Sequence, residues 1–172
     1  NHANDKRWTL DDVLESGKDG VHIYELNSSE MKHGEFETVQ WDEALSAGAV
    51  MWGTLTNDVH QNEDVDRYGY IMLRVPERTA DAALQALRNG DFYAVETGTK
   101  AKIAKYLISD GKIEISAPGA TEIRLLKNGG TTAANFIGDS GEYIVKGDEK
   151  YIRAEIIDPG GFYIFMQPFF IK

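Results

Sequence analysis

The stretch WDEALSAGAVMWGTLTNDVH, residues 41–60, contains the signals that decide the fold expected for this chain. Its first part, WDEALSAG, is typical of a short helix that ends at Gly48, because glycine readily adopts the conformation that closes a helix. The next part, AVMWGTL, is apolar on both faces, which favours a strand that is covered on both sides. An acid and a histidine, Asp58 and His60, follow directly after this strand.

Helix-like and strand-like segments alternate up to about Lys105. Thr9 with Asp12 has the spacing of a capping box, and Thr79 and Gly90 bracket the clearest helix of the chain. Strands are expected in the segments GVHIYELN (20–27), AVMWGTL (49–55) and YGYIMLRV (68–75). Strands that alternate with helices of this length predict βαβ units and a parallel sheet.

The pattern changes after about Leu107, where short β-like runs are separated by Gly, Asn, Asp and Pro turns. In the run KYIRAEII (150–157), polar and apolar residues alternate, which indicates strands of a small antiparallel sandwich or sheet. Two parts are therefore predicted, an α/β part over residues 1–107 and a small β domain over 108–172.

Composition excludes several classes of function. The formal net charge of −10 disfavours nucleic acid and anionic membrane surfaces as partners, since both are recognised by cationic patches. The chain contains no cysteine, which rules out disulfides and thiolate metal sites but leaves the compartment open between cytoplasm and periplasm or exterior. No apolar run reaches the roughly 20 residues that span a bilayer.

Asp58 and His60 are the first candidates for metal ligands. In a parallel α/β sheet, ligands collect at the carboxyl ends of the strands, and these residues follow such an end. If the backbone stays extended there, side chains two residues apart point to the same side. A carboxylate with an imidazole suits Zn, Mn or Fe. The alternative is a turn aspartate beside a solvated histidine.

Two further residues are weaker candidates. His2 is either a ligand or part of a frayed terminus or tag. Glu25 ends the other early strand, where it could contact a substrate or could be a solvated carboxylate. His22 is expected to be packed or hydrogen-bonded within its strand, and His33 lies in the polar loop SSEMKHGE (28–35).

The order of several segments resembles the carboxyl half of PHP-domain metal-dependent phosphoesterases, the polymerase and histidinol phosphatase superfamily. The resemblance is most specific in WD-x-x-LS-x-G…D-x-H and AL-x-x-G-x-FYA-x-x-TG, and it starts at NHAN (1–4). The segment that runs from ATEIRLLKNGG (120–130) to QPFF (167–170) is similar to a small β domain that follows the barrel in many bacterial members.

This resemblance implies a fold and a set of ligands. It implies the carboxyl half of a distorted (β/α)7 barrel, followed by a small antiparallel β-sandwich domain. His2 matches the histidine of a His-Pro-like motif, although Ala3 replaces the proline, and Asp58 and His60 match the last Asp-x-His ligands. The family's amino-terminal His-x-His and Thr-Asp-His motifs are not found in this sequence. The chain alone is therefore expected to be incomplete as an enzyme.

The expected function is part of a metal-dependent phosphoesterase, in which metal-activated water hydrolyses a small phosphorylated substrate. Arg67 is a candidate cation for the phosphate, or an exposed loop arginine. The chain would pair with a second copy or with the missing amino-terminal half. The alternative is a non-catalytic binding or structural module whose β domain carries an interaction. A third possibility, a sugar-binding sandwich, would need exposed aromatic side chains on one face.

Overall fold

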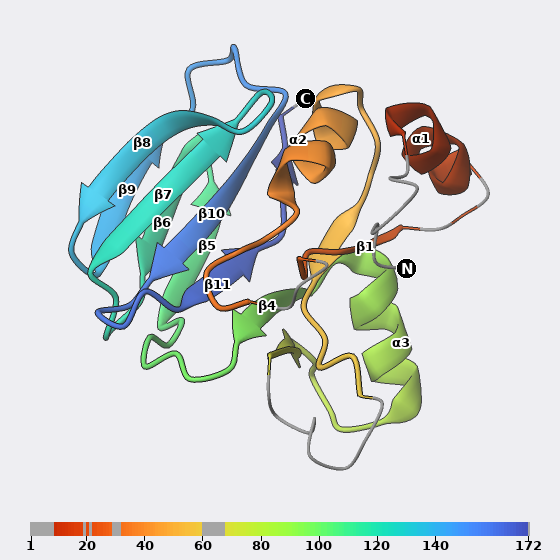
Figure 1. Ribbon diagram of the computed structural model, residues 1–172. Coiled ribbons are helices and arrows are strands. Elements are labelled where there is room, and N and C mark those ends of the chain that lie inside the picture. Colours follow the sequence, from red (N-terminus) through yellow and green to blue (C-terminus); the bar gives the residue numbers. More distant parts are fainter. Residues whose placement is uncertain (1–8, 19, 21, 29–31, 60–67, 172) are drawn as a thin grey trace.

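The computed structural model describes residues 9–18, 20, 22–28, 32–59 and 68–171 and consists mainly of antiparallel β-sheets (Figure 1). The helices are α1 (Leu10–Lys18), α2 (Thr38–Ser46) and α3 (Ala80–Asn89). The strands are β1 (Ile23–Glu25), β2 (Trp52–Thr54), β3 (Gly69–Leu73), β4 (Phe92–Glu96), β5 (Lys105–Ser109), β6 (Lys112–Ser116), β7 (Glu122–Lys127), β8 (Thr131–Ile137), β9 (Ser140–Ile144), β10 (Tyr151–Ile157), β11 (Tyr163–Met166) and β12 (Phe169–Phe170). No described helix is long and apolar enough to cross a membrane.

The predicted half of a (β/α)7 barrel is wrong. Among the described strands only β1 and β2 pair in parallel, and all other strand pairs are antiparallel. Strands β3 and β4 pair antiparallel although α3 lies between them, and Arg74 N donates to Asp91 O at 2.8 Å just beyond this pair. The helix therefore belongs to a connection that leaves the end of β3 and enters the adjacent start of β4. A strand–helix–strand pattern does not specify the direction of the second strand.

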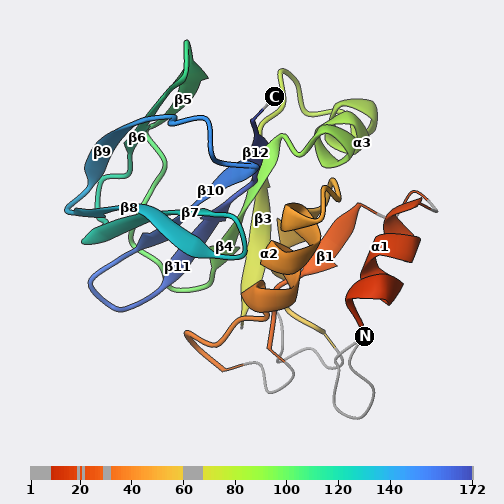
Figure 2. The same ribbon diagram turned by 90° about the horizontal axis from the view of Figure 1, so that it is seen from above.

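A seven-stranded sheet forms the middle layer of the molecule. Its order is β3-β4-β11-β10-β7-β8, with β12 also paired to β10. Strands from both sides of residue 107 therefore share one sheet. A three-stranded sheet, β5-β6-β9, covers one face, and β1, β2, α1 and α2 lie on the other side (Figure 2).

Strand β10 is buried on both faces, because it lies in the middle of the layers. Ile152, Ala154 and Ile156 belong to the apolar cluster between the seven-stranded and the three-stranded sheet. Tyr151 belongs to the second cluster, under α2, and Arg153 is also buried. The polar and apolar alternation of this run is therefore not an outer and an inner face. Both faces are interior.

Helix boundaries follow the caps that the sequence predicts. Thr9 N donates to Asp12 Oδ2 at 2.8 Å, and Asp12 N donates to Thr9 Oγ1 at 3.2 Å, which is the reciprocal capping box. Ala82 N donates to Thr79 Oγ1 at 3.2 Å, and Gly90 closes α3 with a φ of 73°. These local predictions are confirmed.

A buried glutamine joins the small parallel pair to the large sheet. Gly53 N donates to Gln167 Oε1 at 2.8 Å, and Gln167 Nε2 donates to Gly53 O at 2.7 Å. The side chain thus takes the place of a neighbouring strand on the free side of β2. An added Cβ at Gly53 would lie 2.8 Å from the side chains of Leu26 and Trp41. Glycine is therefore required for these two side chains to pack so closely against β2. The glutamine contact fixes the middle of β2 against the residue that follows β11.

Candidate functional site

The carboxyl ends of β1 and β2 lie side by side, as the sequence suggests for these two strands. Glu25 is the register partner of Thr54 at the end of the pair. Beyond it, Asn27 Nδ2 donates to Thr56 O at 2.7 Å, and Thr56 N donates to Asn27 Oδ1 at 3.2 Å. Thr56 Oγ1 also donates to Glu25 Oε1. The asparagine amide therefore extends the pairing past the last strand residues and fixes the segment that leads to Asp58.

Two of the candidate residues predicted from sequence lie on this rim. Asp58 is half-buried, and its φ of 45° is left-handed, so the extended backbone assumed for the Asp-x-His spacing is not present at this residue. Glu25 is half-buried and accepts from Thr56. The remaining candidates, His2, His60 and Arg67, lie outside the described residues.

Glu96, at the carboxyl end of β4, is the centre of a hydrogen-bonded group that sequence reasoning did not find. It is 5% exposed. His33 Nδ1 lies 2.5 Å from Glu96 Oε1, Gly34 N donates to the same oxygen at 3.1 Å, and Tyr163 N donates to Oε2 at 2.9 Å. One buried carboxylate thus joins the 32–36 loop, β4 and the start of β11. The hydrogen bond to Glu96 raises the pKa of His33, and burial acts against this shift.

A pocket of about 200 Å³ opens between this group and the rim of β1 and β2. Its apolar side consists of Phe36, Leu55 and Phe162, and the Phe162 ring lies 4.1 Å from the His33 ring between centroids. Its polar side consists of Asn27, Ser28, Lys32, His33, Glu35, Tyr68, Glu96 and Thr97. The pocket is smaller than the roughly 300 Å³ at which drug-sized sites begin, so it suits a small ligand.

Two hydroxyl groups in the pocket lack an acceptor within the part of the chain that the structure describes. Thr97 Oγ1 is buried and has no hydrogen-bond partner there. Ser28 is 8% exposed, and its Oγ is the acceptor of a 3.5 Å contact from Lys32 N. Buried hydroxyls usually donate as well as accept, so both groups have donor capacity to offer a ligand.

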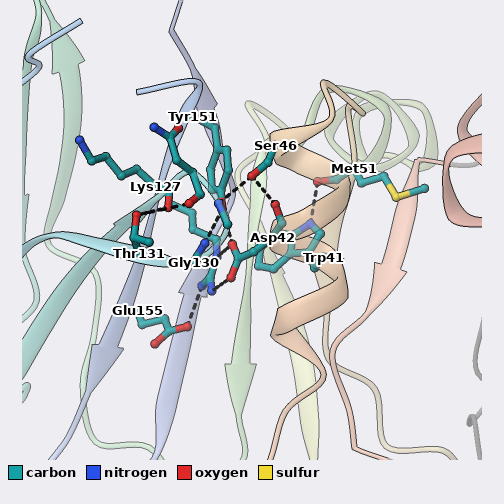
Figure 3. Close-up of polar contacts among 12 residues, drawn as sticks. Trp41, Asp42, Ser46, Met51, Lys127, Gly130, Thr131, Tyr151 and Glu155 are labelled. Carbon is teal, nitrogen blue, oxygen red and sulfur yellow. Dashed lines mark hydrogen bonds and ion pairs between the residues drawn. The ribbon is translucent and has the colours of Figure 1, made fainter. Parts of the chain in front are cut away.

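A second buried polar group connects α2 to β10 and is structural (Figure 3). Arg153 donates from Nε to Asp42 Oδ1 and from Nη2 to Asp42 Oδ2, both at 2.7 Å, and from Nη1 to Glu155 Oε1 at 2.7 Å. Tyr151 Oη donates to Asp42 Oδ1 at 2.6 Å, and the guanidinium lies 4.9 Å from the Trp41 ring. Each charge has a partner, and Asp42 and Arg153 are only 3% and 1% exposed, so neither is open to a substrate.

Of the two described histidines, one behaves as its position in the sequence suggests and the other does not. His22 Nδ1 lies 2.9 Å from Val50 O, which agrees with the expected hydrogen bond, although His22 lies just before β1 and not within a strand. His33, expected to be an ordinary loop residue, lines the pocket instead. Its partner Glu96 stands in AVETG (94–98), at the end of a strand, which is the one signal that could have drawn attention to it.

The predicted metal site is represented in the structure by Asp58 alone. No three His, Asp or Glu side chains come together as a metal-binding group within the described ranges. His60 and His2 would have to complete a site with Asp58. One carboxylate with two imidazoles is a donor set that Zn, Mn or Fe accepts.

Comparison of the chain with protein-family models, with characterised proteins and with solved structures gave no match.

Proposed function

We propose that this chain carries the carboxyl-edge site of a metal-dependent phosphoesterase that acts on a small phosphorylated substrate. The observation that carries the proposal is the meeting of the β1 and β2 carboxyl ends, which holds Glu25 and the segment of Asp58 on one rim beside a pocket. The resemblance of the D-x-H and NHAN segments to the PHP superfamily supports the same function.

Asp58, His60 and His2 would hold the divalent cation in this proposal. When bound, such a cation would stabilise the negative charge that develops on phosphoryl oxygens. Other residues of the chain hold Asp58 and the neighbouring Glu25 carboxylate in position. Asn27 and Thr56 fix the Asp58 segment through their paired hydrogen bonds, and Glu25 is anchored to Thr56. A pocket only about 200 Å³ in size would admit a small substrate.

Metal content tests this proposal before any activity assay. Elemental mass spectrometry of the purified chain should find about one Zn, Mn or Fe per chain, and an Asp58→Ala, His60→Ala double variant should lose it. Asp110→Ala is a matched control, because Asp110 also has a left-handed φ, of 51°, but lies in the β5–β6 turn. This control should retain the metal.

Hydrolysis of 4-nitrophenyl phosphate with added Zn, Mn or Fe is the second test. Activity that the double variant loses and the Asp110→Ala control keeps would support a phosphoesterase. Absence of bound metal in the unchanged chain and in the double variant would contradict the proposal. The chain would then be better explained as a non-catalytic binding module.

A further inference from the structure

The pocket beside Glu96 has more donor capacity than its own residues use. Thr97 Oγ1 is buried without a partner among the residues described, and Ser28 Oγ has only its weak contact from Lys32 N. Neither hydroxyl therefore has an acceptor in that part of the chain. Because each hydroxyl can donate one hydrogen bond, a ligand with several acceptor oxygens would satisfy both.

The charged groups of the pocket leave little acceptor capacity for a cation. The Glu96 carboxylate already accepts from His33 Nδ1, Gly34 N and Tyr163 N, so it has little capacity left for a ligand. His33 is the ion-pair partner of Glu96, and Lys32 adds a second cationic side chain to the wall. The remaining carboxylate of the lining, Glu35, is exposed, so water screens its charge.

We infer that this pocket binds a phosphate group, with Ser28 and Thr97 donating from their hydroxyls and with Lys32 and His33 supplying positive charge. A phosphate group carries three strong acceptor oxygens and a charge near −2, which matches two hydroxyl donors beside two cationic side chains. The choice of phosphate among oxyanions rests on the proposed function. The donor arrangement itself comes from the pocket.

The apolar half of the pocket fits the organic part of a phosphate monoester. Phe36, Leu55 and Phe162 are the apolar residues of the lining, and the Phe162 ring packs directly against Gly98. An added Cβ at Gly98 would lie 2.8 Å from the Phe162 ring, at a φ of 105°. This glycine therefore lets the ring close against β4 and form the wall.

Titration calorimetry on the full chain in a chelating buffer tests the inference, because the chelator removes any contribution of bound metal. Inorganic phosphate and phenyl phosphate are the two probes. At least one should bind saturably, and Thr97→Val, which keeps the side-chain shape but removes the hydroxyl, should weaken binding about tenfold. The matched Thr97→Ser variant keeps the hydroxyl and should stay within about threefold of the unchanged chain.

Backbone amide shifts in an NMR titration locate the bound phosphate. Shifts concentrated at residues 28, 32–34 and 96–98 support the pocket, and a stronger response to phenyl phosphate places the ring on the apolar wall. The inference is overturned if neither probe binds, if Thr97→Val binds as the unchanged chain does, or if the shifts lie elsewhere. Unfolding curves of both Thr97 variants show whether each is folded.

The phosphate-binding test can fail or succeed independently of the test of the proposed function. With chelator present, the Asp58→Ala, His60→Ala variant should bind phosphate as the unchanged chain does, since neither residue lines the pocket. Loss of metal with retained phosphate binding would support both proposals. Metal binding and hydrolysis without saturable phosphate binding in the chelating buffer would overturn the pocket inference alone.

Discussion

At the scale of single residues, Arg153 is a buried cation whose guanidinium bonds to two carboxylates, those of Asp42 and Glu155. Burial alone would lower the pKa of its guanidinium, but the hydrogen bonds to Asp42 and the attraction of Glu155 and Asp42 raise the pKa above its ordinary value. Burial raises the pKa of Tyr151, and the hydrogen bond to the Asp42 carboxylate raises it further. The group is therefore one network in which each charge is stable only while its partner is present.

Removal of the guanidinium should destabilise the protein strongly. Arg153→Met leaves Asp42 and Glu155 buried without their cation, which should lower the free energy of unfolding by about 3–5 kcal/mol. Arg74→Met breaks an exposed pair with Asp91, whose contact is 2.8 Å, and should lower it by less than about 1 kcal/mol. Urea unfolding of both variants measures the difference. Equal losses would show that Arg153 is not held as described.

Stability should depend on pH through His33. Its folded-state pKa is raised above the usual value by the hydrogen bond to Glu96, so its contribution is fully present below about pH 6.5. The contribution is lost as the pH rises through the raised pKa. The free-energy difference between the unchanged chain and His33→Gln should therefore shrink as the pH rises above about 6.5. In a Glu96→Gln background this pH dependence should disappear. A difference that grows with pH would contradict the ion pair.

The sequence predicts only the part of the site that depends on local patterns, because the other contacts join residues that are far apart in the chain. Asp58 and Glu25 are recognisable because each stands at the end of a strand-like run, and in the structure Glu25 is the last residue of β1 and Asp58 lies beyond the end of β2. His33 and Glu96 are 63 positions apart, and no local pattern links a loop histidine to that carboxylate. The Asp42–Arg153 pair spans 111 positions in the same way. Such pairs depend on which strands become neighbours.

At the scale of elements, α3 shows how a turn residue and a packing contact act together. Gly90 closes the helix with a φ of 73°, and an added Cβ would lie 2.7 Å from the Trp52 ring on β2. Trp52 Nε1 in turn donates to Arg88 O at 3.1 Å, in the last turn of α3. The end of the helix is thus fixed both by backbone conformation and by a neighbouring strand.

Two alanine substitutions separate these effects. Gly90→Ala and Gly111→Ala introduce the same strain, because their φ values are 73° and 70°, but only Gly90 has a neighbour within 4 Å of the added Cβ. Gly111→Ala should lower the free energy of unfolding by about 1–2 kcal/mol. Gly90→Ala should lose about 1–3 kcal/mol more, through overpacking against Trp52. Equal losses in thermal or urea unfolding would show that the ring contact contributes nothing.

Element prediction succeeds where the signal is local. The caps at Thr9 and Thr79 depend on neighbours three residues away, and both form as expected. Strand direction depends on distant partners, which is why the parallel sheet predicted for the α/β part is wrong where β3 pairs antiparallel with β4. Strand β7 shows a finer failure. Leu125 and Leu126 are consecutive in β7 and both are buried, and the register shift beside them skips Ala133 of β8.

At the scale of the whole molecule, the layers are tied to one another. The seven-stranded sheet contains strands from both sides of residue 107, and Gln167 and Arg153 bond its carboxyl-terminal strands to elements of the first sixty residues. These bonds are buried, so neither part can separate without exposing polar groups that have lost their partners.

Unfolding should therefore be a single transition. Tryptophan fluorescence reports on the surroundings of Trp41 and Trp52, in the early part of the chain, and far-ultraviolet circular dichroism reports mostly on the strands of the later part. Their urea midpoints should coincide, as cooperative unfolding requires. Two midpoints, with the fluorescence change separated from the loss of strand signal, would show that the parts on either side of residue 107 unfold independently.

The charged residues of β10, Arg153 and Glu155, also disfavour pairings of this strand in the wrong register. A strand that is apolar on both faces could shift by one residue against its neighbours with little penalty, because either set of side chains would suit either layer. In β10 such a slip would move Arg153 from Asp42 into the cluster formed by Ile123, Leu125 and their neighbours. An unpaired guanidinium there would be too unfavourable to persist. The ion pair therefore selects the alignment of the central strand and discriminates the native pairing from its nearest competitors.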